Sequence, residues 1–336
     1  MRRREFCLGL VAMPALARSA FADEVSSITL ISQHGLPYLP LMVMEAQKLV
    51  EKHAAKLGVP NLATDYRTLG GTQSLIDALI AGSMHFGIAG VPGLATLWDK
   101  TVGTANEVRG LSAAQAMPFL LVTNKPEIKT IRDFKEGDKI AVPGVKNSNQ
   151  AICLQMAAAK EWGQENYAKL DPLTITLPHP DAAIAIMSRS TELTGHYGVS
   201  PFQDYEAAAP GVRVVLKSYD TLGGPTTNGV MFMAKKFRDA NPKVTSAVYA
   251  ALVEASDFIN KAPRQAGEIY IAKTSEKRSG PAEMEKLISN PDNVWATTPL
   301  NAMRYVEFMH KVGTCKKLPA SWKDLFMPEV HELKGS

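Results

Sequence analysis

The stretch that decides the fold runs from residue 71 to residue 88 and reads Gly71-Thr72-Gln73-Ser74-Leu75-Ile76-Asp77-Ala78-Leu79-Ile80-Ala81-Gly82-Ser83-Met84-His85-Phe86-Gly87-Ile88. Its first part predicts a helix from about Thr72 to Ala81, and Gly82 is a residue that commonly ends a helix. The apolar residues Phe86 to Ala89 then predict a short buried strand. A helix followed so closely by a strand is typical of α/β folds.

The segments before this stretch repeat the same alternation. Residues 28–31 predict a buried first strand, and residues 61–67 predict a second one. Between them, apolar positions from Met42 to His53 predict one amphipathic helix that stops near Gly58. Short strands separated by amphipathic helices indicate βαβ units and a mainly parallel sheet.

The segments after residue 88 predict a second set of strands and helices. Residues 119–126 contain an apolar run followed by Asn-Lys-Pro and are interpreted as a crossover, and the Gly- and Pro-rich residues 223–228 as a second one. Between the crossovers we expect a helix that starts near Ser148, and strands at 139–142, 173–177, 192–197 and 212–217. After them we expect a strand at 230–233 and then mostly helices. The fold class is therefore α/β, with two doubly wound lobes.

The N-terminal residues 1–22 are typical of a cleavable signal peptide. Three arginines at positions 2–4 precede an apolar stretch from Cys7 to Ala17, and Ala20-Phe21-Ala22 matches the small-x-small pattern cleaved by signal peptidase. The apolar stretch is too short for a permanent membrane span. The double arginine favours the twin-arginine route over the general secretory route, so we expect a periplasmic protein that is exported folded.

Removal of the signal peptide changes the charge balance of the chain. Residues 1–22 hold four of the 37 lysines and arginines and one of the 33 acidic residues, so the mature formal charge falls from +4 to about +1. Such a balance gives no reason to expect nucleic acid as a partner. Cys153 and Cys315 remain, and we expect two buried thiols, although an oxidising compartment permits a bridge.

Residues 71–88 resemble the conserved helix–strand signature of type II periplasmic solute-binding proteins of ABC transporters, of the nitrate/sulfonate/taurine and thiamine-precursor-like family. Two further segments agree with this family, namely 131–136 leading into 140–143, and 230–235 leading into Phe237 and Asn241-Pro242. His85 departs from the family pattern, which has an acidic residue there. The resemblance implies a two-segment hinge that closes on ligand, with lobe 1 formed by residues 23–123 plus 229–336 and lobe 2 by residues 124–228.

Candidate ligand-binding residues follow from the rule that open α/β sheets bind ligands beyond the carboxyl ends of their strands, beside helix N-termini. Together with the second crossover, this rule selects Gln33, His34, Gly35, Tyr38, Gly90, Val91, Gln115, Lys146, Asn147, Ser148, Asn149, His196, Tyr197, Thr227 and Asn228.

Structural roles compete with ligand contact at several of these positions. His34 either caps the next helix or contacts the ligand, and Tyr38 either packs in the core or forms a pocket wall. Asn147 to Asn149 are ordinary capping residues, and Lys146 is either a solvated turn residue or an anion partner. His196 is either a satisfied buried group or a ligand contact.

The function that fits these features is binding without chemistry, so we expect no catalytic residue, no metal and no cofactor. The expected protein is a monomer that carries a small organic or inorganic anion to an ABC permease. Two alternatives stay open, an enzyme of the same fold acting on a pyrimidine-type compound and a ligand sensor for a membrane receptor. No Gly-x-Ser-x-Gly, His-Glu-x-x-His or phosphate-loop motif supports the enzyme.

Overall fold

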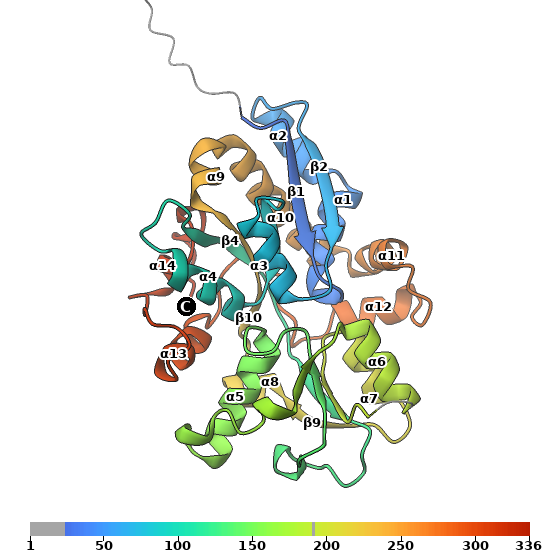
Figure 1. The fold of residues 1–336 in the computed structure, drawn as a ribbon. Helices are drawn as coiled ribbons and strands as arrows, with labels where there is room; N and C mark the ends of the chain where they lie inside the picture. The colour runs from blue at the N-terminus through green and yellow to red at the C-terminus, as the bar shows by residue number, and fades with distance from the viewer. Residues whose placement is uncertain (1–23, 190–191) are drawn as a thin grey trace, which may run out of the picture.

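The computed structural model describes residues 24–189 and 192–336, which form two α/β lobes placed one above the other (Figure 1). The predicted signal peptide, residues 1–22, lies outside the described residues. One lobe is built around a sheet in the order β2-β1-β3-β10-β4, and the other around a sheet in the order β7-β6-β8-β5-β9. The expected α/β class with two doubly wound lobes is confirmed.

The first sheet combines strands from both ends of the chain. Its strands are β1 (Ser27–Ser32), β2 (Ala63–Thr68), β3 (Phe86–Ala89), β4 (Val108–Ala116) and β10 (Thr227–Ala234). β1 pairs in parallel with β2 and β3, whereas β10 runs antiparallel to β3 and β4. The second sheet contains β5 (Leu120–Thr123), β6 (Ile140–Val142), β7 (Thr174–Thr176), β8 (Gly195–Tyr197) and β9 (Arg213–Lys217).

Each sheet is mainly parallel, as expected, but contains one antiparallel strand, which is β10 in the first sheet and β5 in the second. In the second sheet β6 pairs in parallel with β7 and β8, but β5 runs antiparallel to β8 and β9. β5 and β10 are the antiparallel strands. Each is the first strand that the chain forms after it crosses from one sheet to the other. β5 and β10 therefore include residues that the sequence pattern assigned to the two crossovers. The lobe boundaries at 123 and 229 stay a prediction.

The helices that accompany the first sheet range from 4 residues in the shortest to 20 residues in the longest. They are α1 (Leu39–Ala46), α2 (Leu49–Lys56), α3 (Thr72–Ile80), α4 (Val91–Thr101), α9 (Lys235–Ala240), α10 (Pro242–Lys261), α11 (Pro263–Thr274), α12 (Pro281–Ile288), α13 (Met303–Lys311) and α14 (Trp322–Leu325). The second sheet carries α5 (Asn149–Trp162), α6 (His179–Ser188), α7 (Phe202–Ala208) and α8 (Ser218–Leu222).

Five short 3-10 helices complete the described secondary structure, at Leu36–Tyr38, Ile131–Asp133, Gln164–Asn166, Asp171–Leu173 and Pro328–Val330. The single helix expected from Met42 to about Gly58 was wrong, because Lys48 adopts a left-handed conformation with φ 52° and separates α1 from α2. The turn redirects the chain so that α1 and α2 both pack against α10.

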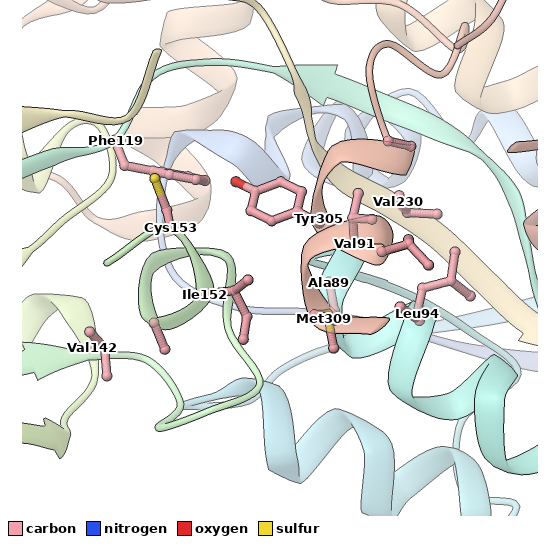
Figure 2. Packing of buried hydrophobic residues seen from close by; sticks show 14 of the residues in the cluster. Ala89, Val91, Leu94, Phe119, Val142, Ile152, Cys153, Val230, Tyr305 and Met309 are labelled. Carbon is pink, nitrogen blue, oxygen red and sulfur yellow. The ribbon is translucent and has the colours of Figure 1, made fainter. Parts of the chain in front are cut away.

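A continuous apolar core joins the two lobes on the side of α13. Figure 2 shows Tyr305 of α13 between Phe119 and Cys153 on one side and Val91 and Val230 on the other. The side chain of Tyr305 is fully buried, and α13 contacts both α4 and α5. Cys153 and Cys315 are free buried thiols, as the sequence predicted.

Candidate ligand-binding site

A small cavity of about 20 Å³ lies where the two lobes meet. Residues of both lobes line it, namely Gln33, Pro37, Tyr38, Thr72, Gly90, Gln115, Phe119, Pro143, Asn149, Gln150, His179, Val199, Asn228 and Gly229. A cavity of this size holds about one water molecule. The lobes are therefore in close contact around it, and no lysine, arginine, aspartate or glutamate is found among the described residues of its wall.

Four helices begin at the wall of the cavity. Thr72 is the first residue of α3, Gly90 is the N-cap of α4, Asn149 opens α5 and His179 opens α6. No side chain caps α3, α4 or α6. The first N–H groups of a helix lack intrahelical partners and carry the positive end of its dipole. Four such ends in one place favour a negatively charged group in the cavity.

Three amide side chains in the wall leave an oxygen without a hydrogen-bond partner among the described residues. These atoms are Gln115 Oε1, Asn149 Oδ1 and Asn228 Oδ1. The NH₂ groups of the same side chains donate to backbone carbonyls, from Asn149 to the Asn228 oxygen at 2.6 Å and from Asn228 to the Met117 oxygen at 3.0 Å. The cavity therefore presents acceptors as well as helix N-termini.

A chain of three buried ionisable side chains ends at the cavity. Glu206 Oε1 and Oε2 each lie 2.8 Å from His196 Nδ1, and His196 Nε2 lies 2.8 Å from Nδ1 of His179, which is part of the wall. His196 and Glu206 have fully buried side chains. Burial raises the pKa of Glu206 to about 9 and lowers the pKa of His196 to about 3.

The two imidazoles lie in series between Glu206 and the cavity wall. Each neutral imidazole donates through one ring nitrogen and accepts through the other. Burial, followed by the nearby imidazoles of His196 and His34, lowers the pKa of His179 well below its usual value. Gln150 Nε2, also in the wall, lies 3.5 Å from His179 Nε2, and because an amide nitrogen donates, the ring nitrogen accepts in this contact. His179 is thus a neutral polar side chain of the wall.

Direct contacts between the lobes enclose the cavity. The Leu36 N–H donates to the Ser200 oxygen at 2.7 Å, and Asn147 Nδ2 donates to Gln73 Oε1 at 3.0 Å. Gly71 comes so close to the other lobe that a Cβ there would lie 2.6 Å from the Pro143 oxygen. A side chain at this glycine is incompatible with the observed contact between the lobes.

A larger groove of about 360 Å³ lies beside the cavity and shares Gln33 with it. His34, Gly35, Arg67, Lys273 and Glu276 are among its residues, and Pro180 and Phe202 come from the second lobe. Burial lowers the pKa of His34, and the carboxylate of Asp181 opposes that shift. His34 therefore faces the neighbouring groove and not the cavity.

The structure brings six of the predicted site residues together in the cavity wall, namely Gln33, Tyr38, Gly90, Gln115, Asn149 and Asn228. Contact between these residues and a ligand stays a prediction. His34 and Gly35 line the groove instead.

The other predicted residues have structural roles outside the cavity wall. Ser148 caps α5 by accepting from the Ala151 N–H, and Asn147 bridges the lobes. Thr227 Oγ1 accepts from the Leu300 N–H at 2.8 Å, Val91 is core, and Lys146 is an exposed turn residue. The Tyr197 hydroxyl donates to Cys153 Sγ, and His196 lies one residue behind the wall, where its ring orients His179.

The sequence analysis missed His179, Gln150 and Thr72. His179 follows β7 and opens α6, so the rule that selected the other candidates also applies to it. Gln150 and Thr72 are helix-opening residues whose orientation toward the other lobe depends on the packing of the lobes, and no local pattern indicates it.

Neither a cluster of metal-binding residues nor a membrane-spanning helix is found in the described ranges, 24–189 and 192–336. They contain no group of three or more His, Cys, Asp or Glu residues placed to hold a metal ion. None of their helices is long and apolar enough to cross a membrane.

Solved structures with the same arrangement include several binding proteins. A protein from Bordetella bronchiseptica RB50 superposes with a TM-score of 0.70 at 18% identity, covering 91% of this chain and 96% of that one. The alkanesulfonate-binding protein SsuA from Xanthomonas axonopodis pv. citri, bound to MOPS, gives 0.69 at 15% identity, with 89% and 96% covered. The periplasmic nitrate-binding protein NrtA from Synechocystis PCC 6803 gives 0.64 at 16% identity, with 90% and 84% covered.

The sequence matches no protein-family model and no curated protein. At these low identities the structural likeness establishes the fold, which is that of type II periplasmic binding proteins over about 90% of the chain.

Proposed function

We propose that this chain is an exported solute-binding protein that delivers a small anion to an ABC importer. The observation that carries the proposal is the cavity between the lobes, at which four helix N-termini meet. Helix N-termini bind anions through free N–H groups and the helix dipole. The periplasmic fold and the signal-peptide pattern of residues 1–22 agree with this role.

A single negative charge suits the cavity better than several. Its wall contains no arginine or lysine among the described residues, so a phosphate ester or dicarboxylate would lack a countercharge. Helix dipoles and the free N–H groups of the first helical turns are sufficient for one charge that is spread over several oxygens. The ligand class expected from the sequence, a small monoanion, is therefore retained as the proposal.

Binding requires the lobes to separate and close again. A cavity of about 20 Å³ is too small for an organic ligand, and the lobes around it are held together by the contacts of Leu36 with Ser200 and of Asn147 with Gln73. The chain crosses between the lobes in two places, between β4 and β5 and again before β10. Rotation about two such crossings is hinge closure, which moves the lobes without changing their internal packing.

The binding proposal is supported over the enzyme alternative by the residue types in the wall. The described wall residues include no cysteine, serine, lysine or carboxylate to serve as nucleophile or base. Nε2 of His179 is a candidate base, but it already lies 3.5 Å from the amide nitrogen of Gln150. This wall therefore suits a ligand that is bound and released without a chemical change.

The test is a thermal-shift and calorimetric screen of the mature chain, residues 23–336, against nitrate, sulfonates, pyrimidines and carboxylates. We expect at least one monoanion to raise the melting temperature and to bind with a defined stoichiometry, because a ligand that binds only the folded state stabilises it. Small-angle scattering should show a more compact particle with that ligand than without it. A folded protein that none of these compounds stabilises would contradict the proposal.

A further inference from the structure

The hydrogen-bond acceptors of the cavity wall indicate which groups the ligand carries in addition to its charge. Gln115, Asn149 and Asn228 are 1%, 6% and 4% exposed, and each has a side-chain oxygen without a partner among the described residues. A buried acceptor that has lost water and gained no donor is costly, and native proteins rarely leave one unpaired. Three around one cavity are therefore a recognition feature.

The orientation of two of these amides is fixed by their other hydrogen bonds. Asn149 Nδ2 lies 2.6 Å from the backbone oxygen of Asn228, and Asn228 Nδ2 lies 3.0 Å from that of Met117. Rotation of either amide by 180° would place its oxygen against a carbonyl oxygen, which is repulsive. Gln115 Nε2 donates to the Pro37 oxygen over a longer distance of 3.4 Å, and this contact orients the Gln115 amide in the same way.

The three oxygens belong to different structural elements that meet at the cavity. Gln115 is in β4, and Asn228 is in the neighbouring strand β10, where Gly229 pairs with Gln115. Asn149 comes from the other lobe, at the start of α5. A Cβ at Gly229 would lie 2.4 Å from Gln115 Nε2, and one at Gly90 would lie 2.7 Å from the Asn149 amide. Two glycines thus make room for two of the amides.

We infer that the ligand carries N–H or O–H donors next to its anionic group, and that Gln115, Asn149 and Asn228 accept from them. This inference rests on the proposed function and adds the chemical class of the ligand, a hydroxy-, amino- or amido-substituted monoanion. Nitrate and unsubstituted alkanesulfonates have no donor and would leave all three acceptors unpaired. A single trapped water has two hydrogens and cannot satisfy three acceptors.

Donor recognition is also linked to lobe closure. Asn149 approaches Asn228 only when the lobes are together, since its Nδ2 donates to the Asn228 backbone oxygen across the boundary. A ligand donor shared between Asn149 and the pair in β4 and β10 therefore gains its full set of hydrogen bonds in the closed state alone. A ligand that binds only this state shifts the equilibrium toward it.

The experiment compares anions that differ only in the donor. Binding of isethionate and ethanesulfonate, and of lactate and propionate, is measured by calorimetry on the mature chain, with nitrate as an anion that has no donor. We expect the hydroxylated member of a pair to bind tenfold to a hundredfold more tightly, the usual effect of pairing a buried acceptor. Gln115→Met keeps the length of the side chain and removes one acceptor, so it should reduce this ratio at least threefold. Gln47→Met, the same change away from the cavity, should leave the ratio unaltered.

The outcomes separate this inference from the proposed function. If anions bind with equal affinity whether or not they carry a donor, or if nitrate binds best, the inference fails while solute binding stands. If no anion binds to a protein shown to be folded by circular dichroism, both are contradicted. A donor preference that survives in Gln115→Met, with Asn149→Leu also retaining it, would show that other groups read the donor and would overturn the assignment of these amides.

Discussion

The buried pair of Glu206 and His196 makes the stability of the protein depend on pH in a way that one substitution should remove. In the folded chain burial holds the pKa of His196 at about 3 and the pKa of Glu206 at about 9, so the pair carries one proton between these values. The proton count is the same whether the proton resides on the carboxyl or on the ring. In the unfolded chain glutamate titrates near 4.5 and histidine near 6.5.

The magnitude follows from the difference in bound protons. Above pH 6.5 the unfolded pair holds none and the folded pair still holds one, so raising the pH favours unfolding. Each pH unit then lowers the free energy of unfolding by about 1.4 kcal/mol, and the window up to pH 9 gives a total of about 3 kcal/mol. Below pH 6.5 this contribution no longer changes until the glutamate of the unfolded chain begins to take up protons.

Glu206→Gln removes the titrating carboxyl but keeps a side chain that can donate to His196 Nδ1. Urea unfolding, followed by tryptophan fluorescence at pH 6.5, 7.5 and 9.0, gives the free energies for both proteins. Between pH 6.5 and 9.0 the wild type should lose about 3 kcal/mol more than the variant. Asp204 and Arg278, which also interact with Glu206, are present in both proteins, so their direct contributions largely cancel.

The exposed Glu127→Gln is the matched control and should follow the wild type. Parallel pH profiles for the wild type and Glu206→Gln would refute the assignment of a buried proton to this pair.

Three further predictions concern the lobes and the buried groups. Gly71 has extended backbone angles that alanine adopts readily, yet its Cβ would lie 2.6 Å from the Pro143 oxygen of the other lobe. Gly71→Ala should therefore leave the unfolding midpoint of the free protein nearly unchanged. It should weaken ligand binding at least tenfold in calorimetry and reduce the ligand-induced compaction in scattering. An unchanged affinity would argue against the observed contact between the lobes. His179→Ala removes a buried polar side chain of the wall together with its contact to Gln150 and should weaken anion binding about tenfold, with equal affinity counting against a role in the site. Burial raises the pKa of the Cys153 and Cys315 thiols to about 12, so Ellman's reagent should find two thiols in the denatured mature chain, residues 23–336, and none in the folded one at pH 8; reaction of either in the native state would contradict their burial.

The fold was predictable from the sequence where a local pattern determines the structure. The helix from Thr72 and the strand after it lie within a residue or two of their predicted positions, since capping glycines and apolar runs are local signals. The break at Lys48 was not predictable in this way. The apolar positions continue through it at helical spacing, and the turn is explained by packing against α10, a helix 200 residues later in the chain.

Six of the fourteen residues of the cavity wall could be predicted for a similar reason. Positions after strands, such as Gln33 and Gly90, are found from the sequence because the carboxyl ends of parallel strands lie at one edge of a sheet. His196 lies within β8 and not after it, its ring contacts Glu206, ten residues away, and His179 occupies the wall in its place. The packing of α6 against α7 determines that His179, and not His196, lies in the cavity wall. The order of the strands alone does not indicate this choice.

The apolar core that passes through Tyr305 has a consequence for how the molecule unfolds. Tyr305, Phe119, Ile152 and Val230 belong to one cluster although they come from both lobes, so melting either lobe would expose the side chains of the other to water. Two α/β units that the chain visits in the order first, second, first are therefore expected to denature together. A calorimeter should record one heat-absorption peak whose van't Hoff and calorimetric enthalpies agree, in contrast to a protein whose domains are joined by a solvated linker.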